Sequence, residues 1–185
     1  MRVISGSARG TKLYSLEGLD TRPTLDRVKE SLFNIIMSKI PDSKVLDLFA
    51  GSGAIGIECA SRGAKKVVFC DKSKRAIDII NKNLNKTKLI DKSVVVNSDF
   101  KALLNTTKNK FDLIFIDPPY ATNLAIESVQ EIIKLNLINP EGIIILETDD
   151  EIRLIKQIEK LNCEIEICDI RKYGRVKLIF MKRKG

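Results

Sequence analysis

The chain contains no histidine among its 185 residues. This absence excludes histidine-based triads and histidine-ligated zinc, so catalysis has to use carboxylates, backbone groups or tyrosine. The four cysteines show no CxxC spacing, and at least two of them lie in apolar runs; they are Cys59, Cys70, Cys163 and Cys168. We therefore expect buried free thiols, with neither a disulfide nor a metal site.

Long hydrophobic runs are also absent. No apolar stretch approaches the roughly 20 residues that span a bilayer, and the N-terminus MRVISGSARG lacks the apolar core of a signal peptide. We therefore expect a soluble, cytoplasmic protein with no membrane partner. A length of 185 residues, 44% of them hydrophobic, predicts one domain with at most a small appendage.

Basic residues are in excess. The net charge is +8 at pH 7 and the pI is about 9.3, which favours a polyanionic partner such as nucleic acid. The segment 171–185 carries seven basic residues and no acidic one. A solubilising tail explains this segment as well as an RNA contact does, so charge alone leaves both open.

From about residue 44 onward, apolar strands alternate with segments of helical period, as in Ile77, Ile80 and Leu84. Strands are expected at 44–49, 66–71, 93–97, 111–116, 142–148, 163–170 and 175–182. The segments IIIL and LIFI are apolar at every position, as expected for parallel strands covered on both faces. Together with the alternation of strands and helices, this predicts a doubly wound, Rossmann-like α/β sheet. The last two strands, joined at Tyr173-Gly174, predict a terminal antiparallel hairpin with one face buried and the other basic at its start.

The first forty residues predict a separate unit. Residues 4–16 suggest a short glycine-bearing hairpin. A helix is then expected to start at Arg22-Pro23-Thr24, with Thr24 as the N-cap and a buried stripe of Leu25, Val28, Leu32 and Ile35. We expect an N-terminal extension, 1–40, packed on a main domain, 41–185.

A glycine loop follows the first strand. The segment Gly51-Ser-Gly53-Ala-Ile-Gly56 lets the backbone approach a ligand closely at the start of a helix. It matches the dinucleotide fingerprint too, so an NAD-dependent oxidoreductase is one alternative. Asp47 lies four residues before the first glycine and could accept a hydrogen bond from a cationic amino group. S-adenosylmethionine has such a group and NAD has none, so the loop favours S-adenosylmethionine.

Two more acidic residues follow strands. Asp71 ends the second strand, where a carboxylate can bind both ribose hydroxyls, although a surface acid is the plainer interpretation. In Ser98-Asp99-Phe100, after the third strand, Asp99 could accept from the adenine N6 amino group while Phe100 packs on the ring. Asp99 could equally cap the next helix.

The tetrapeptide Asp117-Pro118-Pro119-Tyr120, after the fourth strand, is the most specific motif. The two prolines fix the backbone and leave carbonyl acceptors. An exocyclic amino group of a base is a poor nucleophile, because its lone pair is delocalised into the ring. Accepting its protons at the Asp117 carboxylate and the Pro118 carbonyl localises that lone pair, and Tyr120 offers a face on which an unstacked base can lie. The motif predicts methylation of an amino nitrogen.

With these residues, the chain resembles the RsmD family of small-subunit rRNA guanine-N2 methyltransferases. The resemblance covers nearly the whole chain and rests on GSARG at 6–10, RPTLDRVKESLFN at 22–34, LDLFAGSGAIGIE at 46–58, the DPPY tetrapeptide and Tyr173-Gly174. The stretch at 22–34 is the discriminating part, because many amino-methyltransferases share the glycine loop and DPPY.

The resemblance implies a seven-strand methyltransferase sheet with the last strand antiparallel, and methylation of one guanine of 16S rRNA, with the assembled small subunit as the favoured substrate. The sequence leaves the oligomeric state open, with a monomer favoured. The resemblance also implies S-adenosylmethionine-binding residues Asp47, Ala50, Gly51, Ser52, Gly53, Asp71, Lys72, Ser98, Asp99 and Phe100. Asp117, Pro118, Pro119 and Tyr120 hold the guanine in this interpretation, and the RNA side comprises Arg9, Arg22, Thr24, Arg27, Glu30 and Arg175. The family often has glutamate at the position of Asp71; the shorter carboxylate of aspartate keeps the same chemistry toward the ribose hydroxyls but does not fix the geometry of that contact.

Two further alternatives stay open. A DNA adenine-N6 or cytosine-N4 amino-methyltransferase uses the same DPPY chemistry but usually has an added target-recognition domain, for which this chain is short. The other alternative is a non-catalytic RNA-binding protein on a methyltransferase fold. Such a protein would not require Asp117 or an intact glycine loop, and the presence of both argues against it.

Overall fold

The computed structural model describes residues 1–16, 23–119, 122–161 and 163–185. A single seven-stranded sheet runs through it in the order β3-β2-β1-β4-β5-β7-β6. The strands are β1 Lys44–Asp47, β2 Lys66–Asp71, β3 Ser93–Asn97, β4 Phe111–Ile116, β5 Ile138–Thr148, β6 Ile165–Tyr173 and β7 Val176–Arg183. Strands β1 to β5 pair in parallel, and β7 runs antiparallel to both β5 and β6. The expected doubly wound α/β sheet with an antiparallel last strand is confirmed.

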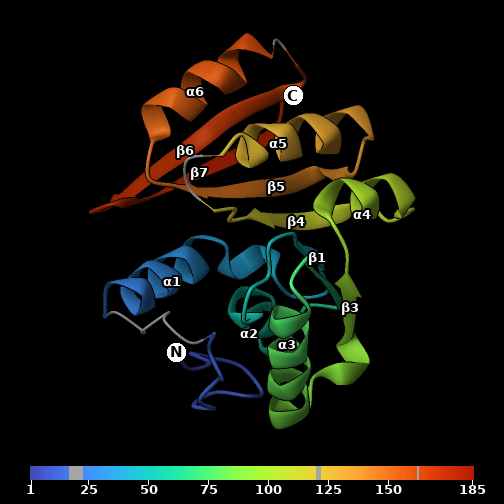
Figure 1. Cartoon of the computed structure of the whole chain (residues 1–185). Coiled ribbons are helices and arrows are strands. Elements are labelled where there is room, and N and C mark those ends of the chain that lie inside the picture. Colours follow the sequence, from blue (N-terminus) through green and yellow to red (C-terminus); the bar gives the residue numbers. More distant parts are fainter. Residues whose placement is uncertain (17–22, 120–121, 162) are drawn as a thin grey trace.

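Helices cover both faces of the sheet (Figure 1). They are α1 Pro23–Ile35, α2 Ala54–Ser61, α3 Lys74–Thr87, α4 Phe100–Thr106, α5 Leu124–Lys134 and α6 Glu151–Lys160, with short 3₁₀ turns at Met37–Lys39 and Ile90–Lys92. In Figure 1, α1, α2, α3 and the N-terminal segment lie below the sheet, and α4, α5 and α6 lie above it. Because strand side chains alternate between faces, each strand contributes to two cores, as Val45 and Leu46 do.

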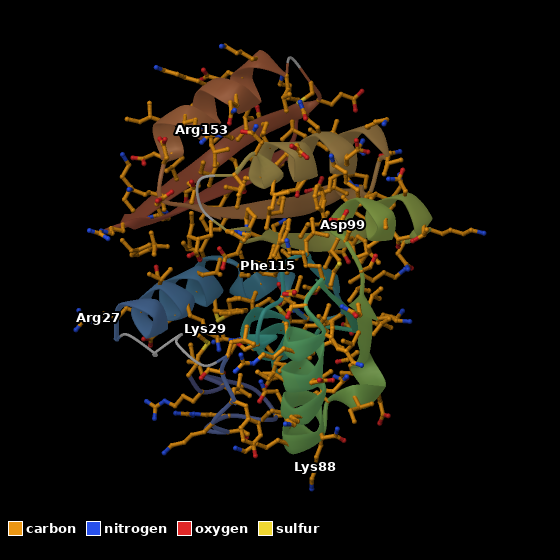
Figure 2. All side chains as sticks on the ribbon, viewed as in Figure 1. Arg27, Lys29, Lys88, Asp99, Phe115 and Arg153 are labelled. Atoms are coloured by element: carbon orange, nitrogen blue, oxygen red, sulfur yellow. The ribbon has the colours of Figure 1, made fainter. Side chains whose placement is uncertain are left out.

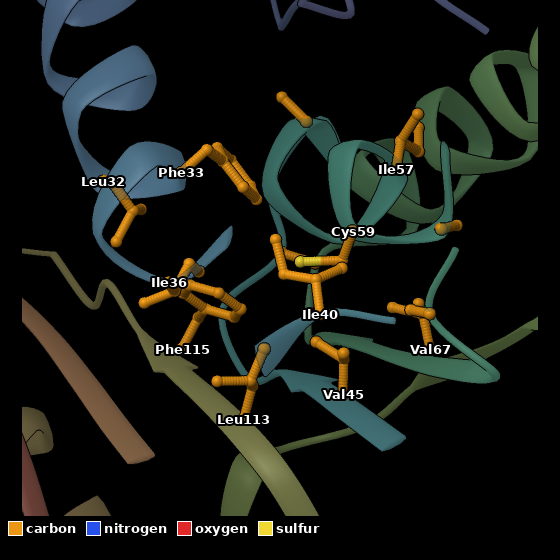
Figure 3. Close-up of a cluster of buried hydrophobic side chains, with 14 of the residues drawn as sticks. Leu32, Phe33, Ile36, Ile40, Val45, Ile57, Cys59, Val67, Leu113 and Phe115 are labelled. Carbon is orange, nitrogen blue, oxygen red and sulfur yellow. The ribbon is translucent and has the colours of Figure 1, made fainter. Parts of the chain in front are cut away.

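The lower core holds α1 against the strands (Figure 3). Val28 and Leu32 are buried as predicted, but Ile35 is 37% exposed, while Phe33 and Ile36 are buried instead. In Figure 3, Ile36 lies beside Phe115 of β4, whereas Phe33 points toward α2. The predicted stripe was therefore wrong at its C-terminal end, because packing partners on other elements decide which face of a helix is buried.

The start of α1 also differs from the expectation. Thr24 is already helical and is not the N-cap, because the helix begins at Pro23. Proline suits the first helical position, where its missing N–H has no acceptor in any case. The side chains of residues 23–26, which include Leu25 of the predicted stripe, and all of Arg22, lie outside the described part.

The observed ends of several strands differ by a few residues from the predicted ends. β1 stops at Asp47, where the chain turns into the glycine loop. β5 begins at Ile138 rather than 142, with a register shift opposite Phe111–Leu113. The predicted β6–β7 hairpin is confirmed, with Tyr173 paired to Val176 across the turn. Val176, Leu178 and Phe180 are buried on one face of β7 as predicted, and the other face is basic only at its start, since Ile179 and Met181 are buried as well. The strand lies inside the sheet, between β5 and β6.

The N-terminal hairpin is reduced to one antiparallel bridge, Arg2 to Lys12, around a compact loop. Gly6, at φ 84°, explains how closely this loop lies on α2, because a Cβ there would stand 1.9 Å from the Ser61 carbonyl oxygen. Val3 and Leu13 are buried in the same core as Val45. The unit thus packs on the main sheet, and the boundary at residue 40 stays a prediction.

All four cysteines are free thiols. Cys59 and Cys70 are buried as expected, whereas Cys163 is half-buried and Cys168 is exposed. None of the helices within the described ranges is both long and apolar enough to cross a membrane.

Candidate active site

Four carboxylates line up at the carboxyl ends of adjacent parallel strands. In the order β2, β1, β4 and β5, they are Asp71, Asp47, Asp117 and Glu147. Ligands of open α/β sheets bind at this edge. We call these four residues the carboxylate row.

Strand register shows that the carboxylate row occupies one face of the sheet. Asp47 lies opposite Phe69 of β2 and Phe115 of β4. Asp71 and Asp117 follow those two phenylalanines by two residues each, and side chains two residues apart share a face. All three carboxylates therefore point to the face covered by α1 and α2, where Phe115 lies (Figure 2).

The same argument brings in Glu147. Ile116 pairs with Leu146 in the parallel β4–β5 ladder. The next residues, Asp117 and Glu147, leave the ladder side by side on the same face. Sequence reasoning missed Glu147, because it is 30 residues from Asp117 and follows an apolar strand without any motif.

Asp47 is the most buried member, at 5% exposure. One of its oxygens accepts the Gly56 N–H at 3.0 Å. Burial raises the pKa of Asp47 to about 7, against the opposing Gly56 hydrogen bond, and the Asp71 carboxylate adds to the increase. A cation placed beside Asp47 would relieve this cost of ionisation.

The glycine loop takes the predicted form. Gly51 and Gly53 have φ of 54° and 77°, a region that side chains disfavour. Gly53 directly precedes the first residue of α2. The third glycine, Gly56, serves packing, because a Cβ there would stand 2.3 Å from the Phe69 ring.

Asp71 holds the loop in place. Its carboxylate accepts the Gly51 N–H at 2.9 Å on one oxygen and the Ser73 N–H at 2.8 Å on the other. Each carboxylate oxygen has two lone pairs, so acceptor capacity for ribose hydroxyls remains. Ala50 and Ser52 flank the same loop, whereas Lys72 is exposed beyond it.

The segment Ser98-Asp99-Phe100, after β3, contains the N-cap of the next helix, which was one of the two predicted roles of Asp99. Asp99 is the N-cap of α4 and accepts the Lys101 N–H at 2.9 Å; Figure 2 shows it at the start of that helix. Ser98 donates its hydroxyl to the Asp99 carbonyl. Phe100 is only 3% exposed, and its ring centroid lies 5.5 Å from that of the half-buried Phe49. Contact of these residues with adenine stays a prediction.

The DPPY segment is described as far as Pro119. Asp117 itself is exposed. Partial desolvation of its carboxyl group, followed by the charges of Glu147 and Asp47, raises the pKa of Asp117 well above its ordinary value. Pro118 is buried and the Pro119 carbonyl accepts the Thr122 hydroxyl at 2.8 Å. Tyr120 lies outside the described residues.

Of the predicted RNA-side residues, Arg9, Arg27, Glu30 and Arg175 are exposed. The structure brings the β6–β7 turn against α1, because the Tyr173 hydroxyl and the Ser31 hydroxyl form a hydrogen bond. The turn that carries Arg175 thus lies beside the helix that carries Arg27 and Glu30 (Figure 1). For Arg22 and the Thr24 side chain, the prediction falls outside the described residues.

Sequence reasoning also missed Glu58, which anchors the N-terminal unit. This fully buried carboxylate on α2 accepts the N–H groups of Ile4 and Ser5, at 2.8 and 2.9 Å. Lys29 and Arg62 neutralise it at 3.1 and 2.7 Å. An acid inside the apolar helix AIGIECAS was the available signal.

Asn83 connects the N-terminal unit to the glycine loop. This fully buried amide of α3 accepts the Tyr14 N–H at 2.7 Å and donates to the Tyr14 and Ser52 carbonyls at 3.0 and 2.9 Å. The proposed RNA side and the proposed cofactor loop are therefore joined through one side chain. An asparagine on the buried stripe beside Ile80 and Leu84 was the only sequence signal.

Taken with the strand order, the glycine loop and the strand-end carboxylates define a Rossmann-like methyltransferase fold. The chain belongs to the family described as "Conserved hypothetical protein 95", whose model matches residues 1–182. It is 34% identical over 188 residues to "Putative rRNA methyltransferase YlbH" of Bacillus subtilis, covering 100% of both chains. It is 40% identical over 158 residues to "Ribosomal RNA small subunit methyltransferase D" of Haemophilus influenzae, covering 84% of this chain and 82% of the relative.

A solved structure described as a putative methyltransferase from Escherichia coli superposes with a TM-score of 0.86 at 29% identity. The match covers 100% of this chain and 98% of the other. Within the described ranges, no group of three or more potential ligand side chains could hold a metal ion.

Proposed function

We propose that this protein transfers a methyl group from S-adenosylmethionine to the exocyclic N2 of a guanine in the 16S rRNA of the small ribosomal subunit. The observation that carries the proposal is the carboxylate row, with Asp117-Pro118 at its substrate end. The names of the relatives, which refer to ribosomal RNA methylation, support the substrate class.

The charge of the site favours S-adenosylmethionine over NAD. The raised pKa values of Asp47 and Asp117 reflect carboxylates that burial and one another's charge make costly to ionise. A ligand carrying a sulfonium and an ammonium group compensates such a site, whereas the anionic pyrophosphate of NAD would add to the repulsion. We infer that Asp47 faces the cationic end and Asp71 the ribose, beside the glycine loop.

Bound S-adenosylmethionine supplies an electrophilic methyl group, and the chain supplies the positioning of the acceptor base. The Asp117 carboxylate and the Pro118 carbonyl accept the two N–H groups of the guanine amino group, which directs its lone pair toward the methyl group. One proton has to leave that nitrogen as the N–C bond forms. A carboxylate with a raised pKa is suited to hold this proton, as Asp117 is. Tyr120 provides the face on which the base stacks.

The RNA side is the surface around α1. Arg9, Arg27 and Arg175 are exposed cations on elements that pack together, and the chain as a whole carries a net charge of +8. Phosphate contacts of this kind supply affinity without reading sequence. We infer that the substrate is the assembled subunit, in the cytoplasm.

The test uses small subunits from a strain that lacks this gene, purified protein and tritiated S-adenosylmethionine. Nuclease digestion is expected to release label as N2-methylguanosine. Label found only in N6-methyladenine refutes the substrate assignment, and label in DNA but not in subunits favours the DNA amino-methyltransferase. A protein that binds subunits without transferring label is the non-catalytic alternative. Affinity for NADH and none for S-adenosylmethionine would overturn the cofactor assignment.

A further inference from the structure

Glu147 is the member of the carboxylate row to which the proposed reaction assigns no role. It is half-buried near the end of β5, and its charge contributes to the raised pKa of Asp117. The two neighbouring carboxylates repel each other when both are ionised. A ligand that donates a hydrogen bond to each of them would offset this repulsion.

Asp117 and Glu147 lie on neighbouring strands, so both carboxylates can contact the same base. Ile116 and Leu146 are paired, so Asp117 and Glu147 project from neighbouring strands on the same face. Neighbouring strands lie about 4.8 Å apart. Adjacent donors on one edge of a planar base can reach two side chains at such a spacing.

Guanine has the required pattern of donors on its Watson–Crick edge. Its N1–H lies beside the N2 amino group, so the edge presents donors to both carboxylates. Adenine and cytosine present an acceptor nitrogen beside their amino group instead. A carboxylate opposite that nitrogen would set two acceptors against each other, which is unfavourable in a desolvated site.

We propose that Glu147 selects guanine by accepting its N1–H, while Asp117 and Pro118 accept the N2 amino protons. This inference rests on the proposed function and adds the residue that distinguishes guanine from adenine and cytosine. Glu147 acts here on specificity, and S-adenosylmethionine binding does not require it.

The base analogue 2-aminopurine distinguishes the proposed role of Glu147 from that of Asp117. It keeps the N2 amino group but has an unprotonated N1. We would first map the target nucleotide, then reconstitute small subunits whose 16S rRNA carries guanine or 2-aminopurine there, and measure single-turnover methylation. The intact protein is expected to methylate guanine at least about tenfold faster than 2-aminopurine, as expected for loss of one charge-assisted hydrogen bond.

The Glu147→Gln variant is expected to narrow this preference at least about tenfold, because a glutamine amide can donate to the unprotonated N1. Its affinity for S-adenosylmethionine should stay within about threefold of the original, by calorimetry. Glu141→Gln is the matched control: it changes an exposed glutamate at the other end of β5 and should leave the preference unchanged.

If Glu147→Gln slows the methylation of guanine and of 2-aminopurine equally, Glu147 has a structural role and the inference is overturned. Equal rates of the unsubstituted protein on guanine and 2-aminopurine would overturn it as well, and this comparison needs no variant to fold. Failure of the unsubstituted protein to label guanine N2 at all would instead refute the proposed function, and the inference with it.

Discussion

Asp47→Asn is expected to stabilise the free protein while weakening its binding of S-adenosylmethionine. The pKa of the Asp47 carboxyl rises from an ordinary 3.8 to about 7 in the folded chain. Between these two pH values the folded state binds more protons than the unfolded state, so folding stability falls as pH rises. Asparagine has no charge to desolvate and keeps an oxygen that can accept the Gly56 N–H.

The magnitude follows from the two pKa values. Each pH unit across which only the folded state holds the proton costs about 1.4 kcal/mol. The raised pKa of Asp47 thus lowers the free energy of unfolding by about 4 kcal/mol above pH 7, where the folded carboxyl is ionised, and by about 2 kcal/mol at pH 5, where it still holds the proton that the unfolded chain has lost. Asp47→Asn should therefore raise the free energy of unfolding by up to these amounts, with the larger gain at pH 8.

Urea unfolding of both proteins at pH 5 and pH 8 measures the gain. Asp91→Asn, which changes an exposed aspartate in a 3₁₀ turn, is the control and should stay within about 0.5 kcal/mol of the original at both pH values. A gain for Asp47→Asn that is equal at the two pH values, or a loss at pH 8, would refute the reasoning. Calorimetry should show the matching functional cost: the original protein binds S-adenosylmethionine more tightly as pH rises through 7, and the variant binds weakly at every pH.

Three further variants test the rest of the site. Asp117→Ala should slow single-turnover methyl transfer at least about a hundredfold while cofactor affinity changes little, and full activity would dispose of the mechanism. Asn83→Ala removes the three hydrogen bonds that the buried Asn83 side chain makes to the N-terminal unit and the glycine loop, so it should lower stability by about 2–3 kcal/mol and weaken cofactor binding. The exposed Asn85→Ala on the same helix is its control, and equal behaviour of the two variants would argue against the connection. Gly56→Ala puts a methyl group against the Phe69 ring and should cost about 1–3 kcal/mol in urea unfolding; an unchanged midpoint would contradict the packing argument.

Strand positions and the glycine loop could be predicted because their signals are local. Continuous apolar runs such as 113–116 predict buried strands, and Gly51 and Gly53 meet a backbone requirement at their own positions. The β6–β7 hairpin was likewise predictable from a short turn.

Boundaries and buried faces were less predictable. Ile35 had the right spacing for the stripe of α1, but Phe33 and Ile36 are buried instead, because Phe115 and the N-terminal unit decide where the helix lies. The start of β7 alternates between basic and apolar residues, as in an edge strand, yet β7 lies inside the sheet between β5 and β6. Its pairing with β5 joins segments that are distant in the chain, which a local pattern does not encode.

The sequence by itself determined the fold class, the glycine loop and the Asp117-Pro118 motif, since each depends on residues adjacent in the chain. Tertiary structure decided which side chains meet there. Glu147 stands beside Asp117 across 30 residues of chain, and Asn83 reaches Ser52 across 31. Such contacts depend on strand register and helix packing, which no local pattern of residues encodes. The motif therefore predicts the kind of reaction, and the register of β4 and β5 supplies the carboxylate that we propose selects the base.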